Sequence, residues 1–169
     1  MIKLKSILLN ELTSMKSPID NRLRIHLSPK PVENLENKTE DQSIHYYKPT
    51  GLWYGFGREW INFIHSKNMK YKFGEYIYFV KIKDRSKLLQ IKNFEEICKF
   101  TEKYEGQCDD RGWVNWRNVV KDYSGIEINP VQEEFSEFIK WYKDWDVASG
   151  CIWDPNILEL KQVYPKKQI

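Results

Sequence analysis

The stretch GLWYGFGREWINFI, residues 51–64, places a short strand directly before a helix. Its first six residues combine aromatic and aliphatic side chains between two glycines, which suits a strand. A helix is predicted from about Gly57 to Ser66, because Trp60, Phe63 and Ile64 then fall on one face. The chain therefore mixes the two kinds of element at close range.

Strands and helices follow one another irregularly on either side of this stretch. In RLRIHLS, residues 22–28, apolar and polar side chains alternate, which predicts a half-buried strand with His26 on its polar face. Further strands are predicted in GEYIYFVKIK (74–83), KLLQIK (87–92), GIEIN (125–129) and SGCIWD (149–154). Helices are predicted in NFEEICKFTEKY (93–104), VNWRNVVKDY (114–123) and QEEFSEFIKWYKDW (132–145). Without a regular βαβ alternation, this order favours the α+β class.

The length and composition fit one domain. A chain of 169 residues with 41% apolar residues can bury one sizeable core, whereas two domains would be cramped. We expect an N-terminal amphipathic arm over residues 1–16 and a single catalytic domain over 17–169. The polar, acidic segment of about 29–49 is expected to be a flexible loop.

Cysteine use and hydropathy indicate the compartment. Cys98, Cys108 and Cys151 are odd in number and lack histidines at metal-ligand spacing, which favours a reducing compartment and no metal. The N-terminal stretch has no signal-peptide core, and no run approaches the roughly 18 apolar residues of a membrane span. A cytoplasmic protein without a membrane partner is expected; the oligomeric state stays open.

The aromatic content suggests a ligand groove. Seven Trp in a chain with 15% aromatic residues exceed what such a core needs, so some are expected to line a surface groove. Trp141 and Trp145, four residues apart, are instead expected to share a helix face in the core. The net charge of +3 is spread along the chain and decides little.

Three short motifs carry a family resemblance. His26-x-Ser28 ends a predicted strand, Gly51-Leu52-Trp53 leads into a helix, and acidic residues follow a later strand. In this order they resemble the ADP-ribosyltransferase fold of the poly(ADP-ribose) polymerase and diphtheria-toxin branch. The resemblance implies a mixed or antiparallel split β-sheet with flanking helices, and NAD as a substrate.

The resemblance also implies roles for the first motif. His26 is expected to bind the adenosine ribose, and Ser28 and the backbone after the histidine are expected to bind the nicotinamide amide. Leu27 stands where the branch usually has glycine, so a side chain lies beside the ligand.

The second motif is expected to hold the nicotinamide ring. Gly51 and Leu52 match the branch, and Trp53 replaces its usual tyrosine as the stacking aromatic. A second stacking aromatic is expected at Trp60, with Phe63 as the second choice.

The position of the catalytic acid stays open among three glutamates. Glu134 is expected to oppose the oxocarbenium character of the ribose, with Gln132 beside it in a Gln-x-Glu pattern. Glu127, within the preceding strand, is the alternative. Glu133 and Glu134 also suit the first turn of a helix, where the macrodipole favours acids.

The resulting expectation is a mono-ADP-ribosyltransferase that transfers ADP-ribose from NAD to a protein or nucleic-acid acceptor. Such an enzyme would suit a toxin, an effector or a phage-encoded modifier. One alternative is an aromatic-groove module that binds nucleic acid or sugar, although only Lys48 and Arg58 lie near the groove in sequence. Another is an RNA 2′-phosphotransferase, which Arg22 and Arg24 leave open. In the purely structural alternative, His26 is a polar-face histidine and Trp53 a core anchor.

Overall fold

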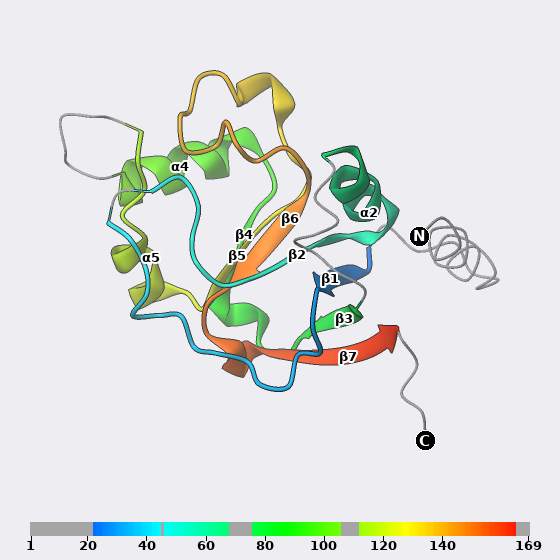
Figure 1. Ribbon diagram of the computed structural model, residues 1–169. Helices are drawn as coiled ribbons and strands as arrows, with labels where there is room; N and C mark the ends of the chain where they lie inside the picture. The colour runs from blue at the N-terminus through cyan, green and yellow to red at the C-terminus, as the bar shows by residue number, and fades with distance from the viewer. Residues whose placement is uncertain (1–21, 45, 68–75, 106–111, 165–169) are drawn as a thin grey trace.

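The computed structural model describes residues 22–44, 46–67, 76–105 and 112–164 (Figure 1). Within them the chain is an α+β fold with one seven-stranded mixed sheet and three α-helices. The arm expected over residues 1–16 lies outside the described residues, as does Cys108.

The sheet has the strand order β4-β5-β6-β2-β1-β3-β7, and every neighbouring pair is antiparallel except β4 and β5. Its strands are β1 (Arg24–Ser28), β2 (Leu52–Phe56), β3 (Tyr76–Ile82), β4 (Leu88–Ile91), β5 (Gly125–Ile128), β6 (Ser149–Ile152) and β7 (Leu158–Tyr164). The centre of the sheet is thus built from strands that lie far apart in sequence.

The helices are α2 (Gly57–Ser66), α4 (Phe94–Tyr104) and α5 (Trp116–Asp122). Helix α4 begins where the Asn93 side chain accepts a hydrogen bond from the Glu96 backbone N–H at 3.0 Å, which satisfies a free donor of the first turn. Figure 1 shows α4 and α5 beside the β4–β5 side of the sheet and α2 near β2. None of the helices in the described ranges is long and apolar enough to cross a bilayer.

Three apolar clusters form the core. The largest lies under α4 and α5 and contains Trp116, Trp141, Trp145 and Trp153, each at most 2% exposed. A second cluster occupies the opposite sheet face, where strands from both ends of the sheet meet, and a small third cluster lies under α2. With Trp60 in the third cluster, five of the seven tryptophans therefore serve packing.

Two segments differ from the sequence prediction. The helix predicted over 132–145 is wrong: only a short 3₁₀ turn, η2 (Glu133–Phe135), forms there, followed by further turns. Trp141, Tyr142 and Trp145 are all buried. Trp141 Nε1 donates a hydrogen bond to the Thr101 hydroxyl, and the Tyr142 hydroxyl accepts one from the Gln132 backbone N–H. These side-chain bonds hold the turns.

Strand β7, which pairs with β3, was not predicted, although its Leu158 and Leu160 alternate with polar residues.

The described residues between β1 and β2 form no helix or named strand, yet their backbone is tied to the domain. The buried Gln42 side chain donates to the carbonyls of Lys38 and Thr50 and accepts from the Thr50 N–H. The Lys38 N–H donates to the Trp153 carbonyl at 2.7 Å. This loop therefore closes on itself and on the residue that follows β6.

Candidate active site

Strands β1 and β2 separate after two residue pairs. Arg24 pairs with Phe56 and Ile25 with Gly55, and the ladder then stops. Beyond this point β1 continues against β3, and β2 continues against β6. The sheet is therefore nearly divided into a β4-β5-β6-β2 part and a β1-β3-β7 part.

His26 lies at the point of separation. Its Nδ1 is 2.7 Å from the Trp53 carbonyl oxygen, so Nδ1 carries the proton and donates this bond. Burial lowers the pKa of His26, and the bond to Trp53 offsets this only in part. The imidazole is therefore neutral near pH 7, and Nε2 is an acceptor that receives no hydrogen bond from the described residues.

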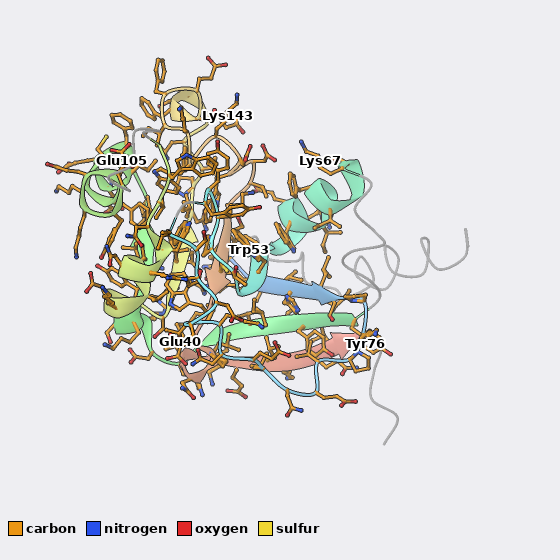
Figure 2. All side chains as sticks on the ribbon, turned by 60° about the vertical axis from the view of Figure 1, so that its left-hand side comes forward. Glu40, Trp53, Lys67, Tyr76, Glu105 and Lys143 are labelled. Atoms are coloured by element: carbon orange, nitrogen blue, oxygen red, sulfur yellow. The ribbon has the colours of Figure 1, made fainter. Side chains whose placement is uncertain are left out.

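Trp53 forms an aromatic surface on the other face of the sheet. Its half-buried ring lies 5.2 Å from the ring of Trp145, and the Lys48 ammonium lies 5.6 Å from the Trp53 centroid. Burial lowers the pKa of Lys48. Trp145 Nε1 is buried and has no hydrogen-bond partner among the described residues. Figure 2 shows Trp53 in the middle of the molecule.

The other residues of the two motifs lie around this separation. Ser28 ends β1, and its hydroxyl donates to the Lys30 carbonyl at 2.6 Å, which closes a local turn. Leu27 and Leu52 are half-buried on the two separating strands. Gly51 packs against β6, because a Cβ there would collide with the Ile152 carbonyl. The packing of β2 on β6 thus explains this glycine.

Glu127 is the centre of a buried polar network on the His26 face. Its carboxylate accepts bonds from Arg24 Nε at 2.5 Å and Arg24 Nη2 at 2.9 Å, from the Tyr54 hydroxyl at 2.7 Å and from Gln90 Nε2 at 2.8 Å. Arg24 and His26 are two residues apart on β1 and point to the same face. The network therefore lies next to His26 on one side of the sheet.

The charges of this network are fixed by its hydrogen bonds. Burial acts to raise the pKa of Glu127, but the bonds from Arg24 and Tyr54 outweigh it and the pKa is lowered. Burial and the Glu127 charge hold the pKa of Tyr54 well above its usual range. At neutral pH the network contains a carboxylate, a guanidinium and a protonated phenol.

Gly150 lets Tyr54 reach Glu127. It lies on β6, directly between Tyr54 on β2 and Glu127 on β5. The Tyr54 ring passes over Gly150, and a Cβ at position 150 would collide with the end of that ring.

Trp60, expected as a second stacking aromatic, is 4% exposed and packs under α2, where its ring lies against Gly55. Phe63, the second choice, is half-buried beside it, with ring centroids 5.9 Å apart. Both belong to the α2 cluster.

The structure does not bring Gln132, Glu133 or Glu134 to His26. Phe135, in the same 3₁₀ turn, stacks on Phe94 at the start of α4 with centroids 3.9 Å apart. In Figure 1 this yellow-to-gold segment lies above α4, well away from β1. Glu133 and Glu134 are exposed there.

The sequence interpretation missed Arg24, Tyr54 and Gln90 as partners of Glu127, and Trp145 as a neighbour of Trp53. One signal was present, since a glutamate within the apolar strand GIEI requires buried partners.

Cys151 is fully buried, which raises its pKa well above the usual range and keeps it a thiol. Within the described ranges no cluster of His, Cys, Asp or Glu is arranged to hold a metal ion.

Comparison of the chain with protein-family models, curated proteins and solved structures finds no match.

Proposed function

We propose that this protein is an NAD-dependent mono-ADP-ribosyltransferase that binds NAD where β1 and β2 separate. The observation that supports this most directly is the 2.7 Å contact between His26 Nδ1 and the Trp53 carbonyl. It joins the His-x-Ser and Gly-Leu-Trp motifs, which lie about 25 residues apart in sequence, at a break in the sheet.

His26 suits a ribose hydroxyl. Its Nδ1–H is held by the Trp53 carbonyl, so the ring orientation and tautomer are set, and Nε2 accepts a hydrogen bond. Because burial lowers the pKa of His26, this acceptor persists at neutral pH. In the proposed complex a hydroxyl of the adenosine ribose donates to Nε2.

The Trp53 surface suits a planar ring with an anionic neighbour. A half-buried indole offers a stacking face, and Lys48 places a positive charge over it. In the proposed complex Trp53 stacks on the nicotinamide and Lys48 binds the diphosphate.

The reaction breaks the bond between the nicotinamide nitrogen and ribose C1′. Nicotinamide leaves with the electron pair, C1′ gains positive charge, and an acceptor oxygen or nitrogen attacks C1′ and loses its proton. A preorganised carboxylate would oppose that charge. The acid therefore has to lie near the bound ribose.

Of the two acids, Glu127 lies nearer the β1–β2 separation than Glu134, because it shares the sheet face of Arg24 and His26, although Trp53 lies on the other face. Its oxygens already accept bonds from Arg24, Tyr54 and Gln90, so we assign it a positioning role that keeps Tyr54 and Arg24 in place. Exposed Glu134 is assigned no role in NAD cleavage.

The test measures NAD binding and nicotinamide release by the purified chain. NAD is expected to quench Trp fluorescence, and His26→Ala and Trp53→Ala should each weaken binding by about tenfold or more, as expected for the loss of a ligand hydrogen bond or stacking surface. Trp113→Ala is the matched control, because Trp113 stacks on Tyr47 instead (centroids 4.0 Å apart).

Release at saturating NAD separates the two acids. Glu127→Gln should lower the rate by loosening Arg24 and Tyr54, while Glu134→Gln leaves it unchanged. Loss of release in Glu134→Gln alone would move the acid to the 3₁₀ turn. A folded wild-type chain that neither binds NAD nor releases nicotinamide would rule out the transferase.

A further inference from the structure

A basic hollow of about 420 Å³ lies where β1 begins beside β3 and β7. Its lining combines five cationic residues, a few apolar ones and one acid: Arg22, Leu23, Arg24, Phe79, Val80, Lys81, Ile82, Arg85, Glu159 and Lys161. Figure 1 shows β3 and β7 side by side along the lower side of the molecule, with β1 next to them. The volume falls in the range of roughly 300–1,000 Å³ typical of ligand sites.

The hollow concentrates positive charge. Arg24 binds Glu127, and Lys81 lies 3.6 Å from Glu159 in an exposed pair. Arg85 and Lys161 are exposed and form no ion pair within the described residues.

Apolar side chains interrupt the charges. Leu23 is 37% exposed, and Phe79 is half-buried opposite Lys161 on the neighbouring strand. Alternation of cations with apolar surface suits a strand whose phosphates and base faces are both accessible. A duplex hides its base faces, and a simple anion would leave the apolar surface unused.

We propose that this hollow binds single-stranded nucleic acid, with backbone phosphates on Arg85 and Lys161 and a base against Leu23 and Phe79. This binding is independent of NAD. Arg24 also lines the hollow, but its side chain binds Glu127 on the sheet face opposite Phe79, which pairs with Ile25.

The test uses the full chain without NAD and a fluorescently labelled single-stranded oligonucleotide, with binding followed by anisotropy over a range of salt. The double variant Arg85→Ala/Lys161→Ala should bind roughly tenfold or more weakly near 0.1 M salt. It should also lower the slope of log K against log salt by about 1.4, since each phosphate contact on a single strand contributes about 0.7.

The matched control is Lys92→Ala/Lys143→Ala, which removes the same charge from two exposed lysines outside the hollow. It should keep the wild-type salt slope. The proposal would be overturned if both double variants lost the same affinity for the oligonucleotide, or if the wild type did not bind it at low salt. It would also be overturned if a duplex competed as well as the single strand. Binding without nicotinamide release would leave it intact and count only against the transferase.

Discussion

At the scale of single residues, the Glu127 carboxylate depends on a glycine that makes no hydrogen bond to it. Tyr54 reaches Glu127 only by passing over Gly150 on the intervening strand. Because the three residues face one another across β2, β6 and β5, the bond requires a missing side chain in the middle position.

Gly150→Ala is expected to lower the free energy of unfolding by about 2–4 kcal/mol. The added methyl displaces the Tyr54 ring and leaves its buried hydroxyl without an acceptor, while Glu127 Oε2 keeps only the bond from Arg24 Nε. Urea denaturation measures the change. Tyr54→Phe removes the same bond without adding volume, so the effects of the two substitutions should not add in the double variant. Additive effects would mean that Gly150 acts elsewhere.

Only some residues of the candidate site could be predicted from the sequence. The pairing of His26 with Trp53 follows from two short motifs whose order along the chain was informative. Trp60, expected to stack on a ligand, is buried under α2, so an aromatic residue near the motif does not by itself indicate a groove. Arg24 and Gln90 were missed because partners from distant strands leave no local pattern.

At the scale of elements, helices were predicted correctly where the sequence contains a strong capping residue. Helix α4 was predicted from Asn93 and the acids that follow it, and the structure confirms both the cap and the helix. The segment 132–145 has a similar composition but no comparable cap bond, since Gln132 makes none with its side chain. Tertiary burial of Trp141, Tyr142 and Trp145 determined its turns instead.

The cap gives a second stability prediction. Asn93→Ala should lower the free energy of unfolding by about 1 kcal/mol, because the Glu96 N–H loses its acceptor. Asn115 precedes α5 but makes no cap bond with its side chain, so Asn115→Ala is the matched control and should cost less. Thermal or denaturant unfolding of both variants measures the difference. Equal losses would contradict the capping role.

At the scale of the whole molecule, Glu127 connects four strands. Its partners come from β1, β2 and β4, while Glu127 itself lies on β5. Its ionised form is favoured by folding, because the bonds from Arg24 and Tyr54 outweigh burial and lower its pKa. The network therefore links sheet stability to pH.

This linkage has a defined direction. A carboxylate with a lowered folded-state pKa stabilises the fold above its unfolded pKa of about 4.3, and the stabilisation is lost as pH falls toward the folded value. The free energy of unfolding of the wild type should thus decline more steeply below about pH 4.3 than that of Glu127→Gln. Denaturant titrations across acidic pH test this. Glu134→Gln should follow the wild type, and parallel curves for all three proteins would remove Glu127 from the linkage.

The position of β6 between β5 and β2 has a consequence for synthesis of the chain on the ribosome. When residues up to Ile128 have emerged, β2 and β5 are present but their shared neighbour is not, so the sheet cannot be joined through its centre. β3 likewise lacks β7. The nascent chain must therefore keep two partial sheets and their apolar faces apart until Ser149–Ile152 emerges, and folding of this domain follows translation of its last strands.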